Sequence, residues 1–92
     1  MIRSFADRDT ARLADRERVP RWRHVERVAL RKLEMLKAAR TLDDLRVPPG
    51  NRLEALRGDR AGQYAIRVND PYRLCFRWEN GDAHDVELCD DH

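Results

Sequence analysis

The chain has 92 residues, of which 39% are charged and 7% are aromatic, and its net charge at neutral pH is +2. This length fits one domain with a modest hydrophobic core and excludes a second core. No apolar run approaches the roughly 20 residues that a membrane-spanning helix needs, and the first residues lack the layout of a signal peptide. We therefore expect a single cytoplasmic domain, with no membrane partner, over residues 1–92.

The small net charge hides a separation of charge along the chain. Residues 1–45 carry 12 basic and 8 acidic residues, and residues 46–77 carry 7 basic and 3 acidic residues. Residues 78–92 contain 6 acidic residues and no lysine or arginine. Uneven charge of this kind is often only a solvated surface. The alternative is a cationic surface with a carboxylate-rich C-terminal edge, which suits phosphate chemistry because cations hold the phosphate while other groups move protons.

The first half of the chain predicts a short strand followed by helices. Residues 2–5 form a candidate edge strand, and residues 10–18 form a candidate helix that Asp7 or Asp9 caps. After a proline, apolar residues recur at helical spacing to about residue 39. These residues are Trp22, Val25, Ala29, Leu33 and Leu36. The Pro48-Pro49-Gly50 sequence then ends the helical part of the chain.

After the prolines, the hydrophobic period changes to two, which is typical of strands. Apolar side chains alternate with polar or small ones in three segments, around residues 64–68, 72–78 and 86–88. Residues 52–56 are expected to add a fourth strand. The pattern gives each strand one buried face. The order of the elements therefore predicts an α+β domain, in which an N-terminal strand and two helices pack on a small antiparallel sheet.

Matching of the apolar faces predicts how the strands pair. A three-residue loop at residues 69–71 aligns all the apolar residues of the two strands that it joins, whereas an even loop would set them against polar residues. A second three-residue loop, at residues 79–81, pairs Leu74 with Val86.

The same registers bring charged residues together on the opposite, arginine-rich face of the sheet. Arg67 is predicted to lie directly opposite Arg73, and Arg73 opposite Glu87. Directly opposed like charges are mildly destabilising. Two interpretations are open: Glu87 neutralises the arginine pair and nothing binds there, or the pair forms a hole shaped for an anion. The registers also separate Cys75 from Cys89, which indicates free thiols rather than a disulfide.

The sequence contains none of the common motifs for nucleotide binding, zinc proteolysis or serine hydrolysis. Of the three histidines, His24 is expected at the surface or as a cap, and His84 as a polar residue of a strand. His92 follows Asp90 and Asp91 at the end of the sequence. On its own, a histidine in that position is a weak catalytic candidate. His92 is a candidate because it directly follows the predicted arginine-rich sheet.

Residues 52–78, RLEALRGDRAGQYAIRVNDPYRLCFRW, and the following ENGDAHDVELCDDH resemble the second half of a HigB-type toxin of the RelE/ParE superfamily. The segments SFADRDT, LEMLKAARTLDDL and PPGNRLEAL are similar to the same family, so the resemblance covers nearly the whole chain. It implies a RelE/ParE-like fold and a ribosome-dependent mRNA endonuclease of a type II toxin–antitoxin system. It also implies binding in the ribosomal A site and neutralisation by a HigA-type antitoxin that carries a helix-turn-helix domain.

The resemblance further implies roles for individual residues. Arg73 would hold the scissile phosphate, and Arg57 matches a basic residue of the catalytic site. His92 would transfer a proton, with Asp90 orienting or assisting it. Some relatives have histidine where this chain has Glu54. The candidate residues for RNA or phosphate binding are Arg52, Glu54, Arg60 and Arg67, of which Arg67 comes from the predicted register.

Asp91 belongs to the same catalytic segment and departs from the family, which usually has tyrosine there. An aromatic ring can stack on a base, whereas aspartate adds negative charge near an incoming phosphate. We therefore expect Asp91 to weaken RNA cleavage. The reaction requires no metal or cofactor, because RNA supplies its own 2′-hydroxyl as the nucleophile. The alternatives are a gyrase-inhibiting toxin of the ParE type and a non-catalytic module that only binds an antitoxin.

Overall fold

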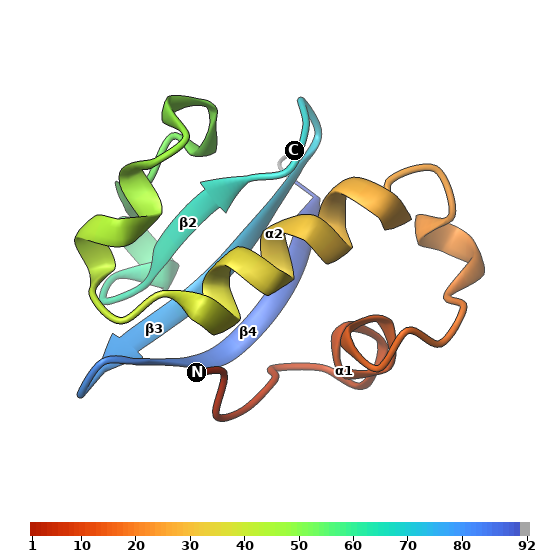
Figure 1. Cartoon of the computed structure of the whole chain (residues 1–92), viewed down its shortest axis with the longest axis horizontal. Coiled ribbons are helices and arrows are strands. Elements are labelled where there is room, and N and C mark those ends of the chain that lie inside the picture. Colours follow the sequence, from red (N-terminus) through yellow and green to blue (C-terminus); the bar gives the residue numbers. More distant parts are fainter. Residues whose placement is uncertain (91–92) are drawn as a thin grey trace.

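A computed structural model describes residues 1–90 and places two helices on one face of a four-stranded antiparallel sheet (Figure 1). The strands lie side by side in chain order: β1 (Glu54–Ala55), β2 (Tyr64–Arg67), β3 (Tyr72–Glu79) and β4 (Asp82–Asp90). The helices are α1 (Arg8–Ala14) and α2 (Glu26–Ala38), with short 3₁₀ turns at Pro20–Trp22, Leu42–Arg46, Pro49–Asn51 and Gly58–Arg60. The predicted α+β class is confirmed.

The first helix is shorter than predicted, and one of the two candidate caps is correct. The carboxylate of Asp7 accepts hydrogen bonds from the backbone N–H of Thr10 at 3.0 Å and from its hydroxyl at 2.5 Å. The Thr10 hydroxyl oxygen in turn accepts the backbone N–H of Leu88 at 3.1 Å, which ties α1 to β4. The helix ends at Ala14 because Arg16 already has a left-handed backbone, with φ of 63°.

The predicted N-terminal strand is reduced to two isolated bridges. Ile2 pairs with Ala83 and Phe5 with Val86, both parallel to β4. Between these bridges, the Ser4 hydroxyl oxygen accepts the backbone N–H of Asp85 at 2.9 Å. Residues 2–5 therefore cover the outer edge of β4 without forming a continuous ladder.

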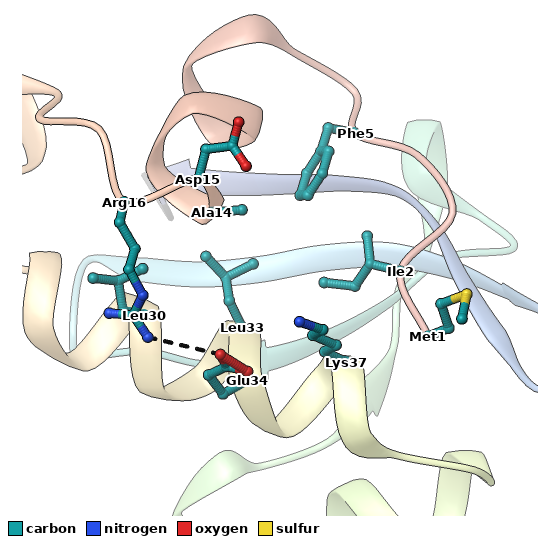
Figure 2. A pocket seen from close by; sticks show the side chains of 10 residues that line it. All are labelled: Met1, Ile2, Phe5, Ala14, Asp15, Arg16, Leu30, Leu33, Glu34 and Lys37. Atoms are coloured by element: carbon teal, nitrogen blue, oxygen red, sulfur yellow. Dashed lines mark ion pairs between the residues drawn. The ribbon is translucent and has the colours of Figure 1, made fainter.

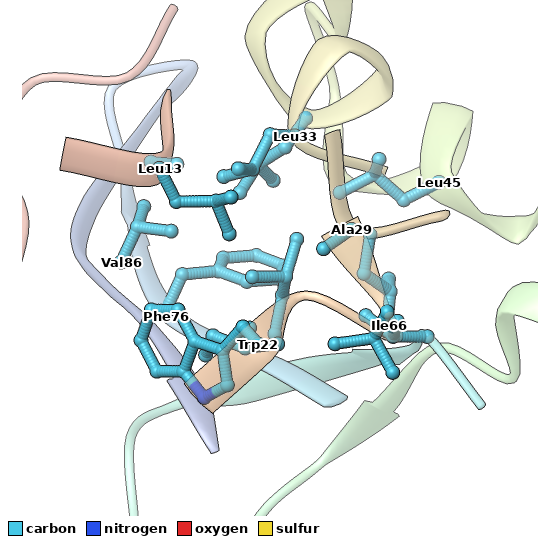
Figure 3. Packing of buried hydrophobic residues seen from close by; sticks show 14 of the residues in the cluster. Leu13, Trp22, Ala29, Leu33, Leu45, Ile66, Phe76 and Val86 are labelled. Atoms are coloured by element: carbon cyan, nitrogen blue, oxygen red, sulfur yellow. The ribbon is translucent and has the colours of Figure 1, made fainter. Parts of the chain in front are cut away.

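The core lies between the helices and the sheet face that they cover (Figure 3). Trp22, Phe76 and Ile66 are almost fully buried in it, and Leu13 of α1 packs in the same cluster. The long helix begins at Glu26 rather than at Trp22, because Pro20 starts a separate 3₁₀ turn that carries the indole into the core.

The register of β2 with β3 is as predicted. Tyr64 pairs with Phe76, and Arg67 lies directly opposite Arg73. The loop between the strands is fixed by Asn69, whose side-chain oxygen accepts the backbone N–H of Tyr72 at 3.0 Å. This Asn-Asp-Pro turn is therefore built from the residue types that favour a tight reversal.

The predicted register of β3 with β4 is wrong by two residues. Asn80 and Gly81, with φ of 51° and 81°, form a two-residue turn instead of the predicted three-residue loop. A bulge at Asp85, where φ is 52°, then inserts one extra residue into β4. Leu74 consequently pairs with Leu88 instead of Val86. A shift of two residues preserves the alternation, so matching of apolar faces cannot detect it.

The shift changes which residues meet on the other face of the sheet. Arg73 lies opposite Cys89, not opposite Glu87, and Glu87 lies opposite Cys75. The cysteines are both free, as predicted, but they are not separated. Cys75 and Cys89 belong to one small buried cluster on the sheet face away from the main core.

A buried polar contact fixes the segment that leads into β1. The Lys32 ammonium on α2 donates to the side-chain oxygen of Asn51 at 2.5 Å, and the Asn51 amide donates to the Leu45 carbonyl at 3.1 Å. Asn51 is fully buried. Burial, together with the nearby Arg31 charge, lowers the pKa of Lys32. The contact therefore holds Arg52 and the start of the sheet against α2.

We expect Asn51→Ala to lower the free energy of unfolding by about 1–3 kcal/mol, because it removes the oxygen that faces a buried ammonium. Urea denaturation followed by circular dichroism measures the change. Replacement of both partners, Lys32→Met with Asn51→Leu, should be milder than the single change, since no polar group is then left without the other. An Asn51→Ala variant with the parent's unfolding midpoint would contradict this role.

Candidate functional site

A cavity of about 150 Å³ lies at the end of the β2–β3 hairpin, beside the directly opposed Arg67 and Arg73. Side chains alternate across a strand, so these two arginines emerge on the face that the helices leave uncovered. Arg52 and Glu54 line the same cavity. Arg52 reaches it from a left-handed backbone, with φ of 48°, directly after the Pro49–Asn51 turn. Four predicted site residues are thus brought together.

Each of the opposed arginines has a carboxylate partner, but neither partner is Glu87. Arg73 donates to Glu54 at 3.1 Å, and Arg67 forms an ion pair with Asp70 at the tip of the loop. The Arg73 side chain is 25% exposed and its partner Glu54 is 59% exposed. The Arg67 side chain is 34% exposed and its partner Asp70 is 93% exposed. Ion pairs with such exposed carboxylates are weak, so a phosphate can replace the carboxylates on the better fixed guanidinium groups.

Arg57 lies next to this cavity. It lines a shallow hollow of about 620 Å³ together with Leu56 and Ala55, and the hollow shares Glu54 and Arg73 with the cavity. The two depressions therefore form neighbouring parts of one surface, with Arg73 at their junction. A chain of nucleotides needs such an extended cationic surface more than it needs a closed pocket.

Arg60 is not part of the cavity. Its guanidinium donates to Glu87 at 3.2 Å and to Gln63 at 3.0 Å, and it lies within electrostatic range of Cys75. Of the two interpretations left open by the sequence, neutralisation of the Arg67–Arg73 pair by Glu87 is consequently wrong, because Glu87 pairs with Arg60 instead.

Of the three predicted C-terminal site residues, the structure describes only Asp90. Asp90 ends β4 and pairs with Tyr72, the residue before Arg73 in the chain. Asp91 and His92 lie outside the described residues. Tyr72 is among the residues that line the cavity, and its ring meets the ring of His24 edge to face, with centroids 5.6 Å apart. This contact was not predicted, and neither was the Arg67–Asp70 pair, although the Asn-Asp-Pro turn is a visible signal for the latter.

A second cavity of about 220 Å³ lies on the helical side of the molecule (Figure 2). Ile2, Phe5 and Leu33 give it an apolar lining, and an ion pair between Arg16 and Glu34 at 3.7 Å crosses its edge. None of the predicted site residues contributes to it. Its lining is suited to apolar groups rather than to a phosphate.

Residues 1–90 contain neither a candidate membrane-spanning helix nor a candidate cluster of metal ligands. No helix in this range is long and apolar enough to cross a membrane. No group of three or more histidine, cysteine, aspartate or glutamate side chains in this range is placed to hold a metal ion.

Helices packed on a small antiparallel sheet, with arginines on its uncovered face, agree with the architecture of a RelE-like toxin. The family model of HigB-like toxins, described as RelE-like toxins of type II toxin–antitoxin systems, matches residues 3–92. The chain therefore belongs to the HigB-like toxin family, as its sequence predicts.

Two relatives support this assignment. The chain is 50% identical to Toxin HigB-1 of Vibrio cholerae serotype O1 over 64 residues, which are 70% of this chain and 67% of that protein. It is 42% identical to an uncharacterized protein of Haemophilus influenzae over 62 residues, which are 67% of this chain and 61% of that protein. The matched region thus spans two thirds of the length of the first relative and less than two thirds of the length of the second.

Proposed function

We propose that this toxin is a metal-independent endoribonuclease that cuts messenger RNA bound to the ribosome. The observation that carries the proposal is the position of Arg73, which lies opposite Arg67 and beside the Glu54 carboxylate at 3.1 Å. RNA transphosphorylation needs cations that stabilise the phosphate and a base that takes the proton of the 2′-hydroxyl nucleophile. Two fixed cations and an exposed carboxylate at one cavity are groups of these kinds.

In this proposal, the scissile phosphate replaces the two carboxylates on Arg73 and Arg67. A guanidinium group can bind two phosphate oxygens in one plane, and it stabilises the negative charge that builds on them in the transition state. Arg52 and Arg57 hold the flanking phosphates. Displacement of Glu54 from Arg73 leaves a carboxylate next to the bound RNA, where it can accept a proton.

Glu54 acts as the general base. It takes the proton of the 2′-hydroxyl, whose oxygen attacks the adjacent phosphorus, and the bond from phosphorus to the departing 5′-oxygen breaks. His92 donates the proton that the 5′-oxygen takes up, and Asp90 orients or assists it. The products are a 2′,3′-cyclic phosphate and a 5′-hydroxyl. Correct placement of these groups replaces metal chemistry.

The proposed setting is the cytoplasm, where the toxin binds in the ribosomal A site. A type II toxin implies an antitoxin partner, and we propose a HigA-type protein with a helix-turn-helix domain. The arginines at positions 52, 57, 67 and 73, which line the cavity and the hollow, favour association with RNA, because each neutralised phosphate releases counterions.

The direct test is to incubate the purified chain with ribosomes programmed with a defined messenger RNA. We expect cuts within codons and products that end in a 2′,3′-cyclic phosphate. Free messenger RNA and supercoiled plasmid treated with gyrase serve as controls. Altered DNA topology with intact messenger RNA would favour a gyrase inhibitor, and no effect in either assay would favour a module that only binds antitoxin.

We expect Asp91→Tyr to increase toxicity, because it removes a negative charge near the phosphate and supplies a ring that can stack on a base. The measurement is growth arrest after induction, at matched expression levels. Asp91→Asn separates the two effects, since it removes the charge without adding a ring. Equal growth curves for the parent and the tyrosine variant would contradict an attenuating role of Asp91.

A further inference from the structure

The two cysteines form a second, smaller cluster on the uncovered face of the sheet. Cys75 is fully buried and Cys89 is 9% exposed, and both pack with Ala65 and Leu56. Cys75 lies opposite Glu87, so Cys89 occupies the diagonal position two residues further along β4. Diagonal positions on one face of an antiparallel pair are roughly 7–8 Å apart, and here the two cysteines share one buried cluster.

The two thiols interact electrostatically and differ in acidity. A hydrogen bond from the Cys89 thiol, aided by the Arg60 and Arg73 charges, lowers the pKa of Cys75. The same hydrogen bond and burial raise the pKa of Cys89. One member of the pair is thus prepared to be a thiolate, which is the nucleophilic form of cysteine, and the other is prepared to be the proton donor beside it.

Two side chains lie near these thiols on the uncovered face. Leu56 packs against them, and the Arg60 guanidinium, which a 3.2 Å ion pair joins to Glu87, is within electrostatic range of both. Both members of this pair are about one third exposed, at 34% and 33%. Surface ion pairs of this kind break easily, so small solutes can reach Cys75 when Arg60 moves aside.

We propose that Cys75 and Cys89 form an oxidisable dithiol, which hydroperoxides convert to a disulfide beside the arginine of the RNA site. With hydrogen peroxide, the sulfur of Cys75 attacks one oxygen, the O–O bond breaks, and the departing hydroxide takes up a proton to become water. The sulfur of Cys89 then attacks the resulting sulfenic acid. The S–S bond forms, the S–O bond breaks, and a second water leaves with the Cys89 proton. Both sulfurs are oxidised and one hydroperoxide is reduced.

Closure of this bond alters the site because of where the cysteines lie. Cys89 is directly opposite Arg73 and directly precedes Asp90. The Cβ atoms of a disulfide are about 3.5–4.5 Å apart, whereas diagonal positions on paired strands are separated by roughly 7–8 Å, and by somewhat less between their Cβ atoms. The strands must therefore shift at Arg73 to close the bond, and a disulfide formed under such strain is readily reduced again. The resulting loss of RNA cleavage rests on the proposed function.

The test oxidises the purified full-length chain with hydrogen peroxide, unfolds it, and labels the remaining thiols with N-ethylmaleimide. Intact mass spectrometry should show a loss of two hydrogen atoms and no label. Peptide mapping should identify a Cys75–Cys89 link within one chain, and dithiothreitol should restore both labels. Two labelled thiols after oxidation, or a link between two chains, would overturn the proposal.

Single variants test the assigned order of events. Cys89→Ser should stop at a sulfenic acid on Cys75, which dimedone traps, and Cys75→Ser should leave Cys89 available to the label. Dimedone on Cys89 alone would overturn the order. Because mass is the readout, these results do not depend on RNA cleavage. In the ribosome assay, the disulfide-linked chain should lose activity until dithiothreitol is added, and an unchanged rate would overturn the coupling between the dithiol and the site.

Discussion

Arg73→Ala is expected to lower the rate of messenger RNA cleavage on programmed ribosomes by about 10²–10³, the loss typical when one fixed donor to a transition-state anion is removed. The reason is the position of Arg73 at the junction of the cavity and the neighbouring hollow, opposite Arg67 and beside Glu54. RNA affinity should fall as well, because the same guanidinium holds the phosphate before and during the reaction.

Arg77→Ala is the matched control. Arg77 lies on the same strand and the same face as Arg73, and it forms ion pairs at 2.9 Å with Glu79 and Asp85. It lines neither the cavity nor the hollow. Its removal deletes the same charge, so a rate close to that of the parent would assign the loss in Arg73→Ala to position rather than to net charge.

Arg73→Lys separates charge from geometry. Lysine keeps the positive charge but cannot bind two phosphate oxygens in one plane, so we expect binding to be largely retained and the rate to fall. Equal rates for the parent and Arg73→Ala, measured on the same ribosomes, would exclude phosphate stabilisation by Arg73.

Periodicity predicted the class of fold and one of the two long strand registers correctly. The Asn69–Pro71 loop left a single register that matched the apolar faces, and Arg67 opposite Arg73 followed from it. At β4 the same criterion failed, because the short turn and the bulge at Asp85 together shift the pairing by two residues and keep the faces matched. At the bulge, the backbone N–H of Asp85 donates to the hydroxyl oxygen of Ser4, which is distant in sequence, so a local pattern could not predict this contact.

The sequence indicated which arginines would lie together, but it did not indicate their carboxylate partners. The arginines at positions 52, 67 and 73 do meet at one cavity. Their carboxylate partners were missed or misassigned, since the failed register gave Glu87 to Arg73. In the structure, Glu54 reaches Arg73 from β1, a strand of only two residues whose alignment with β2 no sequence period could define.

Glu54→Gln is expected to have the second large effect, a fall of about 10²–10⁴ in the rate of cleavage, as is typical for loss of a general base. The amide cannot accept the 2′-hydroxyl proton. It also carries no charge, so it competes less with the phosphate for Arg73 than the carboxylate does at 3.1 Å. RNA affinity should therefore rise while the rate falls, which is opposite to the joint loss expected for Arg73→Ala.

Asp70→Asn provides the comparison for this change. Among residues 1–90, Asp70 is the second carboxylate that lines the cavity, and it is ion-paired with Arg67, but it is 93% exposed at the tip of the loop. Its neutralisation should strengthen RNA binding without slowing cleavage. Single-turnover rates at saturating ribosome concentration separate binding from chemistry for both variants. If Glu54→Gln cleaved faster than the parent, Glu54 would only compete with the phosphate, and the base would have to be sought among the C-terminal residues.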